Sequence, residues 1–380
     1  MKNSQAAVER ELDNARDATG LSNFGAGDFL EPLRVYLNLL ERTNLSPEGR
    51  EQQSQLVHRC LVNRLRFARD VDLHPEILQE DVSDPIVILG FPRSGTTVLQ
   101  RMISADPAMQ NLALWRVLNP APFPGEIAGQ PVERLAIAQA AEDAIRTHNP
   151  ALFTAHPMIV REAEEDWFLH HLTFQHVGNV FWSLLSPEYL EYLRSLPREP
   201  TYRYVADLLR YLQWQDGGRR GRRWVLKTPV HIGCLDALLT AHPRASFVYP
   251  RREFTTVVAS FCHALEASAN STLAITPHQI GELAMGFWTA EMRRFKEAQQ
   301  RLGERLNLME VHYQDLLGYP VRHVREIYRR AGTQLDDRGE AAVNAWLQEN
   351  PAGKHGKNVY QLEHYGLTPS AVDAGFREFQ

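Results

Sequence analysis

The chain has 380 residues, of which 44% are hydrophobic and 23% charged, a composition typical of a globular protein with a sizeable core. The formal net charge of −5 argues against a general binder of nucleic acids or anionic membranes, which needs a basic excess. Cys60, Cys234 and Cys262 lie far apart, so neither a zinc site nor a disulfide framework is indicated. The N-terminus is polar, and no run approaches the ~18 apolar residues of a membrane span. We therefore expect a cytoplasmic protein without integral membrane association.

Residues 1–80 are predicted to be helical, with Phe29, Leu33, Leu37 and Leu40 at helical spacing. We interpret them as a helical cap on one α/β domain that spans residues 81–380. In that domain, short apolar segments predict buried strands at Pro85–Leu89, Trp224–Leu226, Ser246–Tyr249 and Leu306–Val311. Helical patterns separate them, at Thr97–Ser104, His231–Ala241, Thr255–Ala267 and Ile280–Arg301. This alternation predicts a P-loop-like central parallel sheet flanked by helices.

The segment after the first strand, GFPRSGTT at Gly90–Thr97, has the features of a phosphate-binding loop. Glycines five apart let backbone N–H groups turn toward an anion, and the next helix adds its unpaired N–H groups and positive dipole end. Arg93 can supply a cationic fork, and Thr96 and Thr97 supply hydroxyl groups.

This loop departs from the GxxxxGK(S/T) pattern of nucleotide triphosphatases, because Thr96 stands at the lysine position. The strand Ser246–Tyr249 runs into Pro250, Arg251 and Arg252, so no aspartate for Mg²⁺ follows it. We therefore expect a nucleotide whose charge is met by protein cations and not by a metal ion.

These residues resemble the sulfotransferases that use 3′-phosphoadenosine 5′-phosphosulfate, in the bacterial-type branch, with a weaker likeness to protein-tyrosine sulfotransferases. The resemblance runs from about Pro85 to Leu367. It implies that the loop, including Arg93, Ser94, Gly95, Thr96 and Thr97, binds the 5′-phosphosulfate. It also implies that 3′-phosphoadenosine 5′-phosphate is the product and that no metal takes part.

A second motif supports the resemblance. Arg252 and Ser260, eight residues apart, match the family's 3′-phosphate motif, and a strand-end arginine and a helix hydroxyl can converge on one dianion. The segment Asn350–Lys357 resembles the basic, glycine-containing segment that closes over the nucleotide, and it assigns Lys354, His355 and Gly356 to nucleotide binding.

The sequence also departs from the family. Glu253 and Phe254 replace the Asp-Pro pair that often follows the motif arginine. Arg116 replaces the acid of a Trp-Glu pair that is common after the first helix, so this position cannot supply a base here.

Lys227 lies at the end of a predicted buried strand, where open α/β sheets gather ligands. It is similar to the lysine of related enzymes that contacts the phosphosulfate, so we interpret Lys227 and Arg93 as the electrophilic pair. His231, near the start of the next helix, can equally be structural or face the substrate.

Two residues are candidates for the general base. The stretch Glu162–Leu172 is predicted to be a helix, on which Glu165 shares a face with apolar residues that would raise its pKa. His156 is the rival, because histidine suits proton transfer at neutral pH. Both residues can also be structural, and we leave the three alternatives open.

Other patterns are less specific. The segment from Leu112 to Phe153 is rich in proline and aromatic residues and can form an acceptor pocket or ordinary core. The spacing of His170, His171 and His176 matches no known metal-ligand pattern, so no metal site is predicted.

The leading hypothesis is therefore a sulfotransferase acting on the hydroxyl or amine of a small-molecule, lipid or glycan acceptor. A P-loop phosphotransferase or kinase and a non-catalytic nucleotide-binding scaffold are the alternatives. The sequence gives neither the acceptor nor the oligomeric state, and both a monomer and a homodimer are compatible with it.

Overall fold

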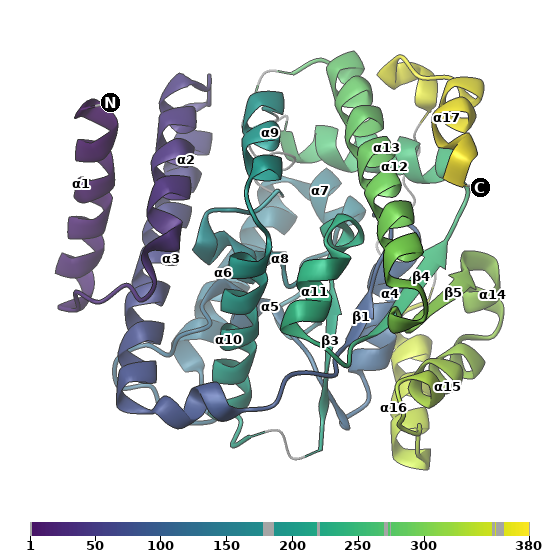
Figure 1. Cartoon of the computed structure of the whole chain (residues 1–380), viewed down its shortest axis with the longest axis horizontal. Coiled ribbons are helices and arrows are strands. Elements are labelled where there is room, and N and C mark those ends of the chain that lie inside the picture. Colours follow the sequence, from purple (N-terminus) through teal and green to yellow (C-terminus); the bar gives the residue numbers. More distant parts are fainter. Residues whose placement is uncertain are drawn as a thin grey trace.

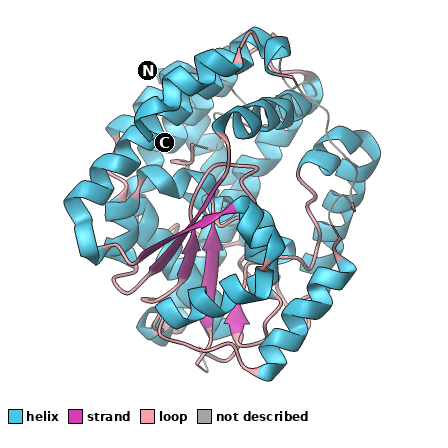
Figure 2. Ribbon diagram, turned by 90° about the vertical axis from the view of Figure 1, so that its right-hand side faces the viewer, coloured by secondary structure: helices cyan, strands magenta, loops and turns pink. Residues whose placement is uncertain are grey.

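The computed structural model describes residues 2–177, 186–218, 221–269, 273, 275–351, 354 and 361–379. A parallel β-sheet lies at the centre of the molecule, and helices surround it (Figures 1 and 2). In the described part of the chain the sheet has the strand order β2-β3-β1-β4-β5. The strands are β1 Ile86–Ile88, β2 Met109–Gln110, β3 Arg223–Lys227, β4 Ser246–Arg251 and β5 Leu308–His312. The predicted fold class and the four predicted strands are confirmed, whereas the two-residue β2 was not foreseen.

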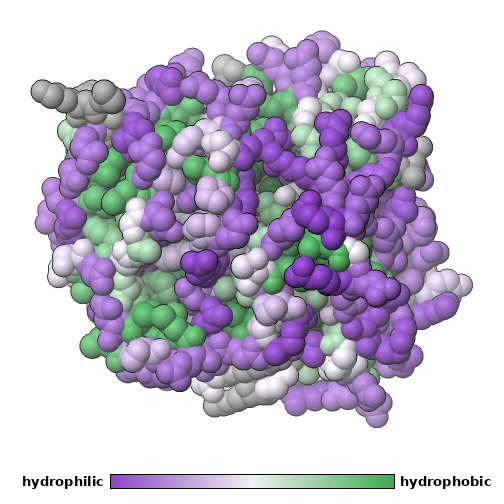
Figure 3. Space-filling view, in the orientation of Figure 1, coloured by the Kyte–Doolittle hydropathy of each residue, from purple (hydrophilic) through white to green (hydrophobic). Residues whose placement is uncertain are grey.

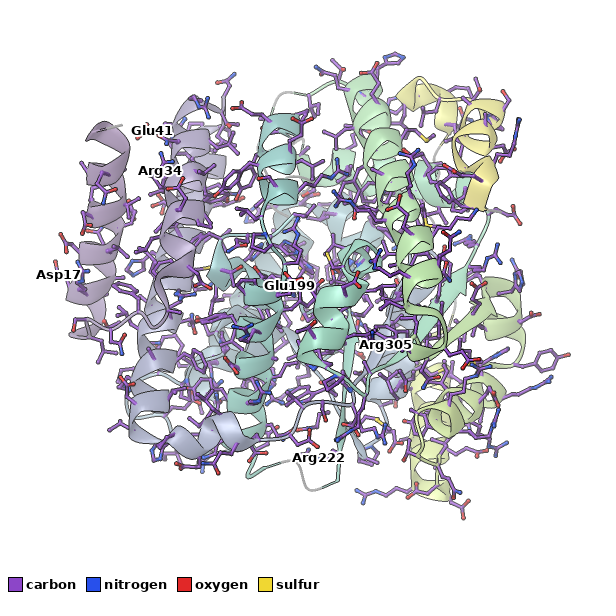
Figure 4. All side chains as sticks on the ribbon, in the orientation of Figure 1. Asp17, Arg34, Glu41, Glu199, Arg222 and Arg305 are labelled. Carbon is purple, nitrogen blue, oxygen red and sulfur yellow. The ribbon has the colours of Figure 1, made fainter. Side chains whose placement is uncertain are left out.

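The register of the sheet brings distant parts of the sequence to one edge. Ile88 of β1 lies opposite Lys227 of β3 on one side and Val248 of β4 on the other, in parallel pairing. The carboxyl ends of the three strands therefore meet at the same edge of the sheet, which is where open α/β sheets bind ligands. Arg222, labelled at the lower edge of Figure 4, directly precedes β3 and marks the opposite edge.

Alternation along the central strand explains how both faces of the sheet are covered. Ile86 and Ile88 belong to one hydrophobic cluster, with residues of α4 (Thr96–Ser104), α15 (Pro320–Arg330) and α16 (Asp337–Glu349). Val87, between them in sequence, belongs to the other and larger cluster. Successive side chains of a strand point to opposite faces, so both faces of this strand are buried, as in other sheets covered by helices.

The remaining helices lie between the strands in sequence or follow the last strand, β5. They are α5 Leu114–Leu118, α6 Val132–His148, α7 Pro150–Ala155, α8 Trp167–His170, α9 Pro187–Ser195, α10 Glu199–Gln215, α11 Leu235–Ala241, α12 Phe254–Ala269, α13 Pro277–Leu302, α14 Tyr313–Gly318 and α17 Pro369–Phe376. The helix predicted over His231–Ala241 is shorter than expected, because Pro229–Gly233 forms a 3₁₀ turn before α11 begins.

The N-terminal region is helical as predicted, with α1 Lys2–Thr19, α2 Leu30–Arg42 and α3 Pro47–Leu73 side by side at the left of Figure 1. Asp17 of α1 lies at the outer edge of the molecule in Figure 4. On the inner side, the buried Arg64 of α3 donates a hydrogen bond to the carbonyl oxygen of Leu172 (3.0 Å) and lies 3.8 Å above the ring of Phe29. The division into a cap of residues 1–80 and a domain of residues 81–380 remains a prediction.

The face of the molecule drawn in Figure 3 is mainly hydrophilic, with hydrophobic residues scattered over it. Among the described residues, no helix combines the length and the apolar character that crossing a membrane requires.

Candidate active site

The segment Gly90–Thr97 joins β1 to α4, as predicted, and its two glycines are required by geometry. Gly90 and Gly95 have φ angles of +114° and +95°, which side-chain-bearing residues rarely adopt. A Cβ atom on Gly95 would lie 2.7 Å from the ring of Tyr313, and one on Gly90 would lie 3.0 Å from that of Tyr249. The loop therefore packs too closely against these aromatic rings for any larger residue.

Gly95 is the N-cap of α4, so the unpaired N–H groups of the first helical turn lie at the loop. Ser94 is buried, and its hydroxyl group donates to the carbonyl oxygen of Phe91 at 2.8 Å, which closes the turn. Arg93 has φ +70°, and its guanidinium donates to the carbonyl oxygen of Ala155. The nine-residue helix and its loop thus form the expected setting for an anion.

The predicted 3′-phosphate residues lie directly against this loop. Arg252 donates from Nη1 to the carbonyl oxygen of Arg93 at 2.9 Å, and Arg93 donates from Nε to Oγ of Ser260 at 3.1 Å. The guanidinium of Arg252 also lies 4.3 Å from the ring centroid of Tyr313. An open cavity of about 640 Å³, lined by Arg252 and Tyr313 among others, extends from here along the ends of β4 and β5.

The C-terminal basic segment is described only in part. Lys354 is exposed, and its Nζ donates to Oδ1 of Asn350 at 3.0 Å. His355 and Gly356, the other two predicted nucleotide-binding residues there, lie outside the described residues.

Lys227 is almost fully buried at the end of β3, with an exposed fraction of 1%. Its Nζ lies 2.7 Å from Oε1 of Glu165 and donates to Oγ1 of Thr97 at 3.3 Å. The other carboxylate oxygen of Glu165 accepts a hydrogen bond from Oγ1 of Thr228 at 3.3 Å. One lysine thus connects the phosphate loop to a candidate base.

The backbone around Glu165 is not helical, contrary to the prediction over Glu162–Leu172, and α8 begins only at Trp167. The preceding residues pair with another segment instead: the N–H of Glu164 donates to the carbonyl oxygen of Leu112, and Ala163 forms a β-bridge. This pairing holds the stretch extended, so the expected apolar helix face for Glu165 does not exist.

The neighbouring Glu164 is 1% exposed, and its carboxylate pairs with one arginine and one histidine. Its carboxylate oxygens lie 2.9 Å from Nη2 of Arg101 and 3.1 Å from Nε2 of His156. Burial raises the pKa of Glu164, but His156, Arg101 and the nearby Lys227 outweigh burial and lower this pKa to about 2. An ionised carboxylate only accepts hydrogen bonds, so Nε2 of His156 carries the proton and, in the neutral ring, Nδ1 has the free lone pair.

A partly open cavity with an accessible volume of about 50 Å³ joins these groups. The polar residues that line it are Arg93, Thr96, Thr97, His156, Glu165 and Thr228. The apolar residues that line it include Trp167, Val230, Phe261, Ala264, Phe287 and Trp288. The structure therefore brings the predicted loop residues Arg93, Thr96 and Thr97 and both candidate bases to one partly open cavity.

The segment from Leu112 to Phe153 contributes nothing to the wall of this cavity within the described residues. The Trp115 ring instead lies 4.8 Å from the guanidinium of Arg134, and Phe123 lies 4.4 Å from that of Arg66. The acceptor-pocket interpretation of this segment is therefore not supported. The aromatic wall comes from α8, α12 and α13, whose sequence pattern is that of ordinary core helices.

Arg116, which replaces the acid of related sequences, makes contacts that stabilise the fold. Its Nη2 donates to the carbonyl oxygen of Leu212 at 2.9 Å and lies 3.0 Å from a carboxylate oxygen of Asp216. These contacts fasten the end of α10, and Arg116 is not part of the cavity wall.

His231 is fully buried and lies 2.8 Å from a carboxylate oxygen of Asp166, with its other ring nitrogen 2.9 Å from the hydroxyl of Tyr202. It is outside the cavity wall, which favours the structural alternative. Across the described residues, no group of three histidine, cysteine, aspartate or glutamate side chains is arranged to hold a metal ion.

Comparison with known proteins gives related sequences and folds. Omega-hydroxy-beta-dihydromenaquinone-9 sulfotransferase Stf3 of Mycobacterium bovis and of Mycobacterium tuberculosis is 27% identical over 254 residues, which cover 65% of this chain. The match spans about 62% of the length of these relatives.

Two crystal structures resemble nearly the whole chain. Sulfotransferase STF1 from Mycobacterium tuberculosis H37Rv has a TM-score of 0.80 at 27% identity and covers 97% of this chain and 98% of its own. Sulfotransferase STF9 from Mycobacterium avium has a TM-score of 0.86 at 25% identity and covers 98% of this chain and 95% of its own. The family model described as "Sulfotransferase family" matches residues 85–337, and the chain therefore belongs to the sulfotransferase family.

Proposed function

We propose that this protein transfers a sulfuryl group from 3′-phosphoadenosine 5′-phosphosulfate to the hydroxyl or amine of a small-molecule, lipid or glycan acceptor. The observation that carries the proposal is the hydrogen-bonded contact of the phosphate loop with both residues of the 3′-phosphate motif. Arg93 donates to Ser260 and accepts from Arg252 through its carbonyl oxygen. The two proposed anion-binding elements are therefore in contact, which supports a nucleotide with phosphate groups on both its 3′ and 5′ oxygens.

The described residues fit this donor better than a magnesium-bound triphosphate. The loop has Thr96 where a triphosphatase has its lysine, and β4 ends at Arg251 and not at an acid. In this donor the sulfuryl group is bonded to the 5′-phosphate, which is the leaving group of the transfer. Arg93 and the N–H groups at the start of α4 are the groups that would hold its 5′ end, and Arg252 and Ser260 its 3′-phosphate.

Lys227 and Arg93 are the proposed electrophilic pair. Both lie at the loop, and Lys227 is nearly excluded from water, so its charge acts in a low-dielectric environment where it is worth more than at the surface. Their role is to stabilise the negative charge that develops on the transferred group and on the leaving phosphate oxygen.

Glu165 is the proposed general base. Its carboxylate lies 2.7 Å from Nζ of Lys227, so it is beside the proposed transfer centre and inside the cavity. Binding of an anion by Lys227 weakens this ion pair and leaves the carboxylate able to accept the acceptor's proton. His156 is the rival, because it lines the same cavity and Glu164 fixes its ring with Nδ1 free to accept a proton.

A lipid among the acceptors agrees with the mycobacterial Stf3 relatives, which are named as sulfotransferases of omega-hydroxy-beta-dihydromenaquinone-9. That substrate belongs to the relatives, and for this chain a lipid alcohol is one of the proposed acceptor classes.

The donor assignment is tested by thermal unfolding with added ligands. A ligand at ~100 times its Kd stabilises by ~2.7 kcal/mol, so saturating 3′-phosphoadenosine 5′-phosphate is expected to raise the Tm, and magnesium-ATP is expected to have little effect. Arg252→Ala is expected to reduce the shift, whereas Arg244→Ala, at the opposite edge of the sheet, is expected to keep it. A Tm shift with magnesium-ATP and none with 3′-phosphoadenosine 5′-phosphate would contradict this proposal and favour the phosphotransferase alternative.

A further inference from the structure

Three phenylalanine rings form a cluster beside the proposed donor-binding residues, and each comes from a different segment of the chain. Phe91 belongs to the phosphate loop, Phe254 is the first residue of α12, and Phe376 is the last residue of α17. The ring centroids of Phe91 lie 5.3 Å from those of Phe254 and 5.7 Å from those of Phe376, both edge-on. Phe254 and Phe376 are stacked, with centroids 4.4 Å apart and planes at 11°. Each ring is therefore in favourable contact with the other two.

Two of these rings belong to the proposed anion-binding elements. The carbonyl oxygen of Phe91 accepts a hydrogen bond from the hydroxyl of Ser94, so Phe91 closes the turn that contains Arg93. Phe254 follows Arg252 by two residues and lines the same open cavity as Arg252. A displacement of either ring therefore moves the element that carries one of the two arginines.

The third ring comes from a helix that packs on the far end of the chain's helical layer. α17 lies against α12 and α13 (Figure 1). Phe376 is fully buried, and a Cβ atom on the neighbouring Gly375 would lie only 2.7 Å from Cε of Met285 in α13, so the helix fits closely there. Phe376 lines neither the cavity at Glu165 nor the open cavity at Arg252. Any effect of this ring on a bound nucleotide must pass through the residues that it touches.

We propose that Phe376 is a positioning residue for the donor, because its ring holds Phe91 and Phe254 in one arrangement and so fixes the phosphate loop relative to the 3′-phosphate motif. This inference rests on the proposed donor and adds a residue of α17 to the structure that the donor requires. A nucleotide with phosphate groups on both its 3′ and 5′ oxygens spans both elements, so its affinity depends on their relative position. A nucleotide with a 5′-phosphate alone depends on the loop only.

The chain contains a matched control for this role. Phe29 is 1% exposed, belongs to the N-terminal helical region and packs against the ring of Phe174, with centroids 6.2 Å apart. Phe376→Ala and Phe29→Ala each remove one buried phenyl ring, so both variants are expected to lose stability. Only Phe376→Ala is expected to change nucleotide binding. A difference in binding between the two variants therefore reports positioning, and not the loss of a buried ring as such.

Calorimetric titration, at a temperature well below the Tm of every variant, measures the Kd of 3′-phosphoadenosine 5′-phosphate and of adenosine 5′-phosphate. Phe376→Ala is expected to raise the Kd of the bisphosphate about tenfold and that of the monophosphate less than about threefold. Phe376→Leu, which keeps much of the volume, should show a smaller effect, and Phe29→Ala should bind both nucleotides as the wild type does. The double variant Phe254→Ala with Phe376→Ala should lose less affinity than the two single losses combined, because Phe376 acts partly through Phe254.

The inference is overturned if Phe376→Ala binds the bisphosphate with the wild-type Kd, if it weakens both nucleotides equally, or if the two single losses combine in full in the double variant. Where Phe376→Ala folds poorly, Phe376→Leu and Phe254→Ala give the same comparison of the two nucleotides. The wild-type titration separates this inference from the donor assignment. With the bisphosphate bound by the wild type and equally by Phe376→Ala, the positioning inference fails alone; with no binding by the wild type, the donor assignment fails as well.

Discussion

Lys227 and Glu165 form a buried ion pair, with 2.7 Å between Nζ and Oε1, at the point where β3 ends beside the phosphate loop. The pair joins the proposed electrophile to the proposed base before any substrate binds. It also makes each residue structurally important to the other, because removal of one partner leaves a buried charge unpaired. Stability and catalysis must therefore be measured together in every variant of this pair.

Lys227→Met is expected to lower kcat by about 10²–10³-fold while the Kd for 3′-phosphoadenosine 5′-phosphate changes much less, because the lysine stabilises charge that develops only during transfer. The variant is also expected to lose stability. The double variant Lys227→Met with Glu165→Gln should regain most of that stability but none of the activity. An equal loss of turnover and nucleotide affinity would make Lys227 a binding residue only.

Glu165→Gln is expected to reduce kcat by about 10²–10⁴-fold, the usual contribution of a general base. His156→Ala is expected to have a smaller effect, and Glu162→Gln, a nearby acid that accepts from Nε1 of Trp346 and is outside the cavity wall, should have almost none. The three variants are compared by steady-state rates across pH. If His156→Ala shows the larger loss and Glu165→Gln keeps wild-type turnover, the base is His156.

Glu164 is expected to make stability depend on acid pH. Its folded-state pKa of about 2 is below its ordinary value of 4.5, so its stabilising contribution is present above about pH 4.5 and is lost as the pH falls toward 2. The size of this contribution is on the order of 3 kcal/mol. Urea unfolding at pH 7 and pH 3 should show a smaller difference for Glu164→Gln than for the wild type. The exposed control Glu188→Gln should behave as the wild type, and equal pH dependence in all three proteins would contradict this role.

Gly95→Ala is expected to abolish nucleotide binding, because a Cβ atom there meets the Tyr313 ring at 2.7 Å and the φ angle is +95°. Gly125→Ala is the matched control: its φ is +79°, but a Cβ atom at that position meets nothing within 4 Å. Both variants carry the backbone strain of about 1–2 kcal/mol, whereas only the first displaces the loop. Calorimetric titration with 3′-phosphoadenosine 5′-phosphate distinguishes them, and equal binding by both variants would show that the loop tolerates the displacement.

The sequence alone predicted the sheet well because its central strands are short apolar runs bounded by glycine and proline. Glycine spacing located the phosphate loop, since only glycine adopts the φ angles of Gly90 and Gly95 without strain. Arg252 and Ser260 meet Arg93 because the strands that precede them, β4 and β1, end at the same edge of the sheet. The hydrogen bonds that join the three residues could not be predicted from the sequence.

Other features depend on contacts between distant segments. The helix expected at Glu165 was wrong because backbone pairing with the segment near Leu112 overrides local helical propensity. The helix predicted over Ile280–Arg301 contributes Phe287 and Trp288 to the cavity wall, and the sequence could not show this, because a helical apolar pattern does not distinguish a packed core from a cavity wall. The pairing of His156 with Glu164 is likewise invisible in a sequence that does not show which side chains meet.

The most direct test of the account is an incubation of the purified protein and a cell extract with sulfur-labelled 3′-phosphoadenosine 5′-phosphosulfate, followed by mass spectrometry of the small-molecule and lipid fractions. A parallel incubation uses magnesium and ATP labelled in its γ-phosphate, and Lys227→Met serves as the inactive control in both. The account predicts a sulfated product that carries the label with the wild type, and its near absence with the variant. Transfer of labelled phosphate with no transfer of labelled sulfur would contradict it.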